Sequence, residues 1–208
     1  VSPFYDPMLA KIIASGPTRE AARLRLIAAL QNTTLFGIDS NLHFLECCLE
    51  KPSFIEGSAT TAFIAEEFGE TAYSANSPGF KESAIAAVLE LAIENQQLHN
   101  SSVIVAHELR DWSSASPLVA RKRYRHGEAV HDLSVTPRSH NNYEVADDEN
   151  HVNIELLELL DTSATLKIER KTQRVRLHRP SPGSLFVAIK NCNATYEDEI
   201  YREGEHEK

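Results

Sequence analysis

The segment at residues 84–93 constrains the fold more than any other part of this sequence. Its residues, AIAAVLELAI, favour a helix and are apolar around almost the whole circumference, with Glu82, Glu90 and Glu94 as the charges along the helix. A helix at a protein surface carries a polar face, whereas a helix that is apolar all round is buried. We therefore expect this helix to be enclosed by other structure.

The residues after this helix have a different hydrophobic period. Apolar and polar residues alternate with a period of two, which is the pattern of half-buried strands. Breaks such as RPSPG at residues 179–183 separate the runs at hairpin intervals. The runs that predict strands are residues 103–105, 118–124, 130–135, 142–145, 152–160, 164–168, 174–177, 185–189 and 196–201. Eight or nine short antiparallel strands with one apolar helix predict a barrel or curled sheet wrapped on that helix.

The region before residue 70 has a mostly helical pattern. Residues 8–14 form a short apolar run, which fits a buried strand better than a helix. Thr18 is expected to cap a helix whose core-facing stripe is Ala22, Leu26, Ala29 and Leu30. The remaining expected elements are a strand or extended link at residues 35–38, a helix capped by Asp39 or Ser40 and ended by Pro52, and a helix at residues 61–68.

A polar stretch with Ser, Pro and Gly divides the chain. Residues 71–79 have the composition of a linker. We therefore expect a small α/β unit at residues 1–70, a barrel unit at residues 80–200 and an acidic linker at residues 201–208. The predicted fold class is α+β.

The charge balance restricts the partners of this chain. The net charge is -9, from 21 Lys and Arg against 30 Asp and Glu. Nucleic acids and anionic membranes bind positive surfaces, so we expect neither as a partner. Cys47, Cys48 and Cys192 do not make a disulfide framework and are interpreted as free thiols of a reducing compartment. We expect a cytoplasmic protein, or a mitochondrial matrix protein in a eukaryote.

Common catalytic motifs are absent from the sequence. The nine His lack a shared metal-ligand spacing and are interpreted as ordinary surface residues. Neither a Gly-x-Ser-x-Gly turn nor a glycine-rich phosphate loop occurs. We therefore expect no metal site and no complete nucleotide site in these residues.

The basic run RKRYR at residues 121–125 is the most suggestive cluster. On a strand, Arg121, Arg123 and Arg125 share one face, and Lys122 and Tyr124 the other. The arginines could contact a phosphate or an acidic partner. The interpretation that we favour is the solvent-facing side of a barrel strand.

The first third of the chain resembles the last part of the biotin carboxylase domain. The similarity runs through SPFYDPMLAKII at residues 2–13, GIDSNL at residues 37–42, FIEG at residues 54–57 and TTAFI at residues 60–64. In that family the stretch around Tyr5, Asp6 and Lys11 helps to pack this part of the domain. Thr61 falls where the family places a residue at the lip of the adenine pocket.

The second part resembles the middle region of the alpha subunit of methylcrotonyl-CoA carboxylase. The matching features are the helix after the linker, DWSS at residues 111–114 before an Arg-rich strand, and the acidic tail. The resemblance implies an antiparallel barrel around a central helix that docks the carboxyltransferase (beta) subunit in a hetero-oligomer. Propionyl- and geranyl-CoA carboxylases are alternatives.

Such enzymes use ATP, Mg and bicarbonate to carboxylate biotin and then pass the carboxyl group to an acyl-CoA. The ATP-grasp core with the catalytic residues would precede Val1. The family's biotinyl Lys lies between two Met, whereas Met8 is the single Met here. The resemblance therefore implies a non-catalytic scaffold segment without a bound cofactor. It also implies that residues 1–70 expose apolar surface to the rest of their alpha subunit.

The sequence leaves two other functions open. The barrel could bind a small molecule or an acyl-CoA, which predicts a pocket beside the helix. A nucleic-acid binder working through residues 121–125 would associate in a salt-dependent manner.

Overall fold

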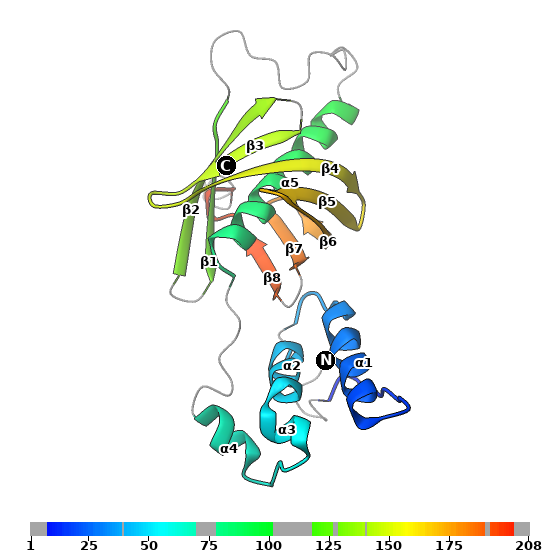
Figure 1. The fold of residues 1–208 in the computed structure, drawn as a ribbon. Coiled ribbons are helices and arrows are strands. Elements are labelled where there is room, and N and C mark those ends of the chain that lie inside the picture. The colour runs from blue at the N-terminus through cyan, green and yellow to red at the C-terminus, as the bar shows by residue number, and fades with distance from the viewer. Residues whose placement is uncertain are drawn as a thin grey trace. The chain divides into compact units, whose positions relative to one another are not determined.

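The computed structural model describes residues 8–38, 40–69, 78–101, 118–126, 129–139, 141–189 and 192–201 (Figure 1). The chain divides into two compact units, Val1–Asn76 and Ser77–Lys208. The linker predicted at residues 71–79 lies largely outside the described residues, as do the strand predicted at residues 103–105 and the acidic residues after 201. In the part of the chain that is described, no helix is long and apolar enough to cross a membrane.

The first unit is helical. Its helices are α1 (Arg19–Asn32), α2 (Leu42–Glu50), α3 (Pro52–Glu56) and α4 (Phe63–Phe68). Helix α1 begins where the sequence predicts, because the Thr18 side chain accepts a hydrogen bond from the Ala21 amide at 3.1 Å. Pro52 ends α2 and is also the first residue of α3, a position at which proline's missing N–H costs nothing. The sequence pattern did not predict α3.

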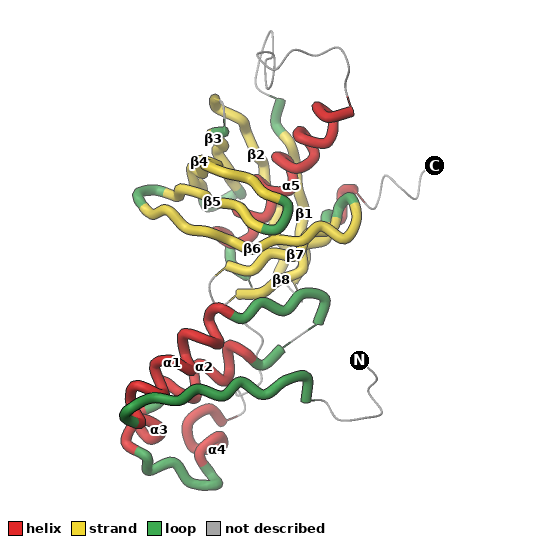
Figure 2. Tube along the Cα trace, turned by 90° about the vertical axis from the view of Figure 1, so that its right-hand side faces the viewer, coloured by secondary structure: helices red, strands yellow, loops and turns green. Residues whose placement is uncertain are grey.

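A small core holds these helices together. Ile27 and Leu30 of α1 pack against Leu49 of α2, and the two helices run side by side (Figure 2). Arg23 fixes the same contact from the rim, because its guanidinium donates to the Leu49 carbonyl at 2.9 Å. Of the predicted stripe, Leu30 is buried and Leu26 is half-buried.

The strand predicted at residues 8–14 is wrong. These residues are extended without strand pairing, and Ile13 is 82% exposed. A strand needs a neighbour to satisfy its backbone groups, and the described residues of the first unit contain no other strand. Residues 35–38 likewise form a link. The first unit exposes large apolar side chains, as expected: Met8, Leu9, Ile13, Leu24, Ile38, Leu45, Ile55 and Ile64.

The second unit is the predicted curled sheet around a helix. Helix α5 spans Phe80–Ser101, and one antiparallel sheet of eight strands follows in the order of the sequence. The strands are β1 (Ala120–His126), β2 (Ala129–Ser139), β3 (Asn142–Ala146), β4 (His151–Leu160), β5 (Ser163–Ile168), β6 (Lys171–Ser181), β7 (Ser184–Ile189) and β8 (Cys192–Glu197). They curve round α5 in both views (Figures 1 and 2). The strand predicted at residues 196–201 corresponds to β8, which begins earlier, at Cys192, and ends at Glu197.

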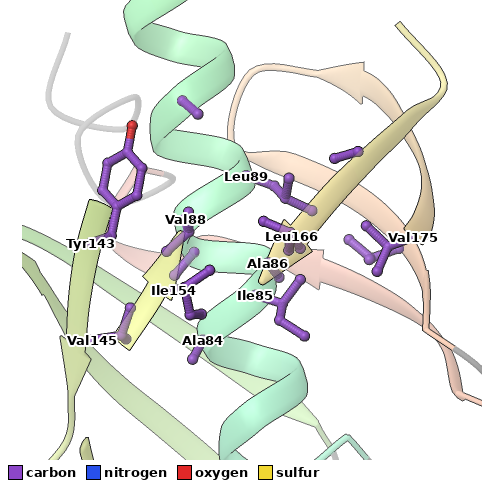
Figure 3. Packing of buried hydrophobic residues seen from close by; sticks show 14 of the residues in the cluster. Ala84, Ile85, Ala86, Val88, Leu89, Tyr143, Val145, Ile154, Leu166 and Val175 are labelled. Atoms are coloured by element: carbon purple, nitrogen blue, oxygen red, sulfur yellow. The ribbon is translucent and has the colours of Figure 1, made fainter. Parts of the chain in front are cut away.

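The main core lies between α5 and the concave face of the sheet. Figure 3 shows Ile85, Val88 and Leu89 of α5 among inward side chains of the strands. Every residue from Ser83 to Glu90 is buried, so the enclosure predicted for this helix is confirmed. Burial of so much apolar surface is the main source of stability in such a unit.

The sheet closes almost completely into a barrel. A single antiparallel bridge joins Tyr124 of β1 to Asp198, the residue after β8. The Arg123 amide also donates to the Asp198 carboxylate at 3.3 Å. This seam between the first and last strands therefore has little backbone pairing, and side chains take over part of its closure.

Candidate functional site

Strand β1 has two chemically different faces, as the sequence predicts. Lys122 and Tyr124 are buried on its inner face. Arg121 and Arg125 are exposed on its outer face, and Arg123 is partly exposed there. The alternation follows from strand geometry, in which successive side chains point to opposite faces of the sheet.

The outer arginines lie among acidic side chains. Arg123 donates to Asp132 of β2 through Nε at 3.1 Å, and Arg125 donates to Glu199 at 2.7 Å. Arg121 makes no ion pair with any residue that the structure describes. Exposed pairs of this kind contribute little to stability. The outer face of β1 is therefore solvated. On this face, Arg121 is the arginine that is available for a contact with a partner.

The inner face of β1 contributes the centre of a buried ionic cluster. The Lys122 ammonium lies 3.1 Å from Asp198, 3.2 Å from Glu94 and 3.6 Å from Glu90. Glu90 and Glu94 come from successive turns of α5. One cation thus joins the enclosed helix, the first strand and the residue that follows the last strand.

The protonation of this cluster is set by burial. Desolvation raises the pKa of the Glu90 carboxyl, although the Lys122 ammonium and the Tyr124 hydroxyl both act to lower it. Tyr124 donates to Glu90 at 2.6 Å, and burial together with this carboxylate holds the pKa of Tyr124 well above its usual range. Burial alone would lower the pKa of Lys122, but the surrounding carboxylates raise it. Lys122 is therefore charged.

A second cation extends the cluster to the surface of the barrel. Arg179 of β6 donates to Gln97 at 2.6 Å and lies 3.4 Å from Glu94. The inward direction of Arg179 continues that of Val175 and Leu177 on the same strand. Glu94 is thus shared between Lys122 and Arg179, and the second of these side chains borders a pocket.

The pocket lies at the C-terminal end of α5 and has a volume of about 430 Å³. Its walls are α5, the end of β4 with the turn that follows, and β6. The lining residues are Ile93, Gln96, Gln97, Asn100, Leu159, Leu160, Asp161, Leu177, His178, Arg179, Pro180, Ser181 and Pro182. A volume of this size is within the range of small-ligand sites.

At the other end of the barrel lies His126. The sequence predicts an ordinary surface residue there, and this prediction is wrong. The His126 ring is half-buried and packs edge-on against Tyr196, with ring centres 4.9 Å apart. Burial lowers the pKa of His126, and His131 adds to the effect. His131 in turn lies 3.2 Å from the Pro78 carbonyl at the start of the unit.

Of the four residues that the sequence singles out in the first unit, the structure describes Lys11 and Thr61. Lys11 is exposed in the extended segment before α1, and Thr61 is exposed in the turn before α4. Tyr5 and Asp6 lie outside the described residues. The role of Thr61 at the lip of an adenine pocket stays a prediction.

The described residues also offer no place for a metal. Within them, no group of three or more His, Cys, Asp or Glu lies in a metal-binding arrangement. The carboxylates that do gather, those of Glu90, Glu94 and Asp198, already surround the Lys122 ammonium. These carboxylates are therefore not available as ligands for Mg.

The buried cluster was not predicted from the sequence, and a pocket beside the helix was predicted only for the alternative in which the barrel binds a small molecule. A partial signal was present, because Glu90 is a charge on an otherwise apolar helix and Lys122 is on the inward side of its strand. A buried charge requires a partner. The identity of the partners Asp198 and Arg179 depends on how the sheet closes, and no local pattern shows it.

The first part of the chain matches the model of a known protein family. Residues 1–66 match the family model of the biotin carboxylase C-terminal domain. The predicted resemblance is therefore confirmed at the level of this domain. The match covers the helices α1 to α3 and most of α4.

Several carboxylases are similar to the chain. It is 38% identical over 113 residues to a protein named propionyl-CoA carboxylase alpha chain from Ruegeria pomeroyi, which covers 53% of the chain and 17% of that protein. It is 47% identical over 64 residues to a biotin carboxylase from Halalkalibacterium halodurans (31% and 14%), and 38% identical over 64 residues to a pyruvate carboxylase from Aspergillus terreus (31% and 5%). The chain thus spans less than a fifth of the length of each.

The alignment with the propionyl-CoA carboxylase alpha chain is informative because of its length. It covers more of the chain than the 66 residues of the family match, so it extends beyond the biotin carboxylase C-terminal domain. The alignments with the biotin carboxylase and the pyruvate carboxylase cover 64 residues each. Similarity to an acyl-CoA carboxylase alpha chain therefore includes residues after position 66.

Proposed function

We propose that this chain is part of the biotin-containing alpha subunit of an acyl-CoA carboxylase of the methylcrotonyl-CoA type. The observation that carries the proposal is the match of residues 1–66 to the biotin carboxylase C-terminal domain. The longer alignment with a propionyl-CoA carboxylase alpha chain supports an acyl-CoA carboxylase over the other carboxylases. In this proposal the whole subunit carboxylates biotin with ATP, Mg and bicarbonate, and a partner subunit transfers the carboxyl group.

The part played by these residues is that of a scaffold. In the second unit, Lys122, Glu90 and Asp198 are buried inside a nearly closed barrel, where Lys122 pairs with both carboxylates. Its outer face presents Arg121 without an ion pair to any described residue. We assign to this unit the docking of the carboxyltransferase (beta) subunit.

The docking role is tested by co-purification of the tagged 208-residue chain with the carboxyltransferase subunit of the same genome. We expect the chain to retain that subunit. Arg121→Glu should weaken the retention, since it reverses the exposed charge on β1. Arg170→Glu is the matched control, because Arg170 is exposed in the turn between β5 and β6. If the unmodified chain retains no carboxyltransferase, the docking role is wrong.

The acyl-CoA preference requires the complete enzyme. The reconstituted alpha and beta subunits are assayed for incorporation of labelled bicarbonate into methylcrotonyl-CoA and propionyl-CoA. A higher kcat/KM for methylcrotonyl-CoA is expected. A preference for propionyl-CoA would keep the carboxylase assignment and overturn the methylcrotonyl type.

The pocket beside α5 favours a second candidate function, the binding of a small molecule by the barrel. Its volume of about 430 Å³ suits a small ligand. Its single Arg, Arg179, already faces Glu94. The phosphates of an acyl-CoA would need more positive charge than this, so an acyl-CoA fits less well than an uncharged molecule. Calorimetry with propionyl-CoA should show no heat of binding.

A further inference from the structure

The pocket at the C-terminal end of α5 has one apolar wall and one polar wall. Leu159 and Leu160 of β4, Leu177 of β6 and the prolines of the β6–β7 region form the apolar wall. Gln96, Gln97 and Asn100 of α5 supply carboxamides opposite. Carboxamides donate and accept hydrogen bonds without carrying charge. The two walls together suit a ligand that is partly aliphatic and partly an uncharged hydrogen-bonding group.

Arg179 has a hydrogen-bonding capacity that the protein does not use. Its side chain is only 10% exposed, and its terminal nitrogens face Gln97 and Glu94. Its Nε is buried and has no hydrogen-bond partner among the described residues. A buried donor without a partner costs free energy, so each such group calls for an explanation. Arg179 also lines the pocket, and its two terminal nitrogens carry four N–H groups, of which Gln97 and Glu94 accept two, so an acceptor bound in the pocket would meet the remaining ones.

The charge around Arg179 indicates that this acceptor is neutral. Lys122 and Arg179 face the carboxylates of Glu94 and Asp198, and Glu90 also lies beside Lys122. The two cations are therefore already matched by carboxylates without any ligand. A further anion would be unbalanced in a buried setting, which is unfavourable. A carbonyl oxygen completes the hydrogen bonds of Arg179 without adding charge.

We propose that this pocket binds an uncharged small molecule that carries a secondary amide next to a branched aliphatic group. The amide carbonyl accepts from Arg179, and the amide N–H and carbonyl face the carboxamides of α5. The aliphatic group packs on Leu159, Leu160 and Leu177. All of these residues lie in the second unit, so the site does not depend on the carboxylase assignment.

The test uses a matched pair of probes and the 208-residue chain. N-acetyl-leucine N-methylamide is neutral, and N-acetyl-leucine has the same side chain and first amide but carries a carboxylate. Binding is followed by methyl-resolved NMR, which reports on Ile93, Leu160 and Leu177. We expect the neutral probe to shift these methyl signals in a saturable manner and to bind at least about fivefold more tightly than the carboxylate.

Two pairs of variants locate the site. Arg179→Lys keeps the charge but removes the guanidinium, and should weaken the neutral probe about fivefold. Arg174→Lys is its control, because Arg174 is exposed on the same strand and donates to Ser163. Leu160→Ala should also weaken binding. Leu157→Ala is the control, because Leu157 is on the same strand, is equally exposed at 47% and does not line the pocket.

The outcomes separate clearly. Saturable shifts support the site if Arg179→Lys and Leu160→Ala lower the affinity for the neutral probe. Both control variants should keep an affinity within twofold of that of the parent chain. Equal affinity for the two probes overturns the neutral-ligand class. Two results overturn the site itself. One is an absence of shifts at a probe concentration on the order of 10 mM, where even weak specific binding would be visible. The other is an affinity that the pocket variants leave unchanged.

Discussion

The Nζ atom of Lys122 lies 3.1 Å from the carboxylate of Asp198, and this ion pair crosses the seam between the first strand and the residue after the last one. One backbone bridge, Tyr124 to Asp198, accompanies it. Seven full ladders hold the other strands together. The seam is therefore the part of the barrel that depends most on side chains.

Replacement of Lys122 should destabilise the barrel strongly. Lys122→Met leaves Glu90 and Asp198 buried without their cation, and removal of one partner from a buried cluster costs about 3–5 kcal/mol. Urea unfolding followed by near-ultraviolet circular dichroism measures the loss. Lys167→Met is the control, since Lys167 makes an exposed pair with Glu155 and should cost less than about 1 kcal/mol. Equal losses in the two variants would contradict a central role of Lys122.

The stability of the barrel should depend on pH through Glu90. Burial raises the pKa of Glu90 above its ordinary value of 4.5, so the folded chain binds a proton more tightly than the unfolded chain. The resulting stabilisation is full below pH 4.5 and is lost as the pH rises through the folded pKa. Glu90→Gln should flatten this decline in urea unfolding series. Tyr124→Phe keeps the carboxyl and should keep the decline, and a flat profile in the parent chain would refute the prediction.

His126 should titrate with the opposite sign. Burial lowers its pKa below the ordinary 6.5, so the unfolded chain binds the proton more tightly. The barrel then loses stability as the pH falls from 6.5 through the folded pKa. NMR titration of the His126 ring should give a midpoint below 6.5. The free energy of unfolding of His126→Phe, relative to that of the parent chain, should be higher at pH 5.5 than at pH 7.5. A midpoint of the His126 titration above 6.5 would exclude this account.

Gly183 should be sensitive to any side chain. Its φ is +72°, and an added Cβ would lie 2.5 Å from Cδ1 of Tyr201. Gly183→Ala should therefore cost about 3 kcal/mol, from backbone strain and overpacking together. A Tyr201→Ala background removes the ring atoms and leaves only the Cβ of residue 201, at 3.2 Å, so the cost should fall to about 1 kcal/mol. Thermal unfolding of the parent chain, the two single variants and the double variant measures the coupling between the two positions. Additive costs of the two substitutions would disprove the clash.

The sequence predicted much of the second unit because its signals are local. The apolar circumference of residues 84–93 predicted an enclosed helix, and α5 is buried from Ser83 to Glu90. Alternation predicted eight strands that the structure contains, although the last of them spans Cys192–Glu197 and not residues 196–201. The same alternation placed Lys122 inward and Arg121 outward.

The first unit was harder to predict from pattern. The apolar run at residues 8–14 has the composition of a buried strand, yet it has no strand beside it. A short apolar run does not by itself carry the information about its neighbours. Pro52 was interpreted as the end of a helix, although proline also favours the first position of the next helix, as in α3.

By itself, the sequence determined the helix, most of the strands, the two faces of β1, and the likeness of residues 1–66 to the biotin carboxylase C-terminal domain. Tertiary structure decided that Lys122 meets Asp198 and that Arg179 meets Glu94 beside a pocket. The physical reason is one of range. Side-chain direction depends on the residues immediately before and after, whereas closure of the sheet brings together charges from opposite ends of the unit.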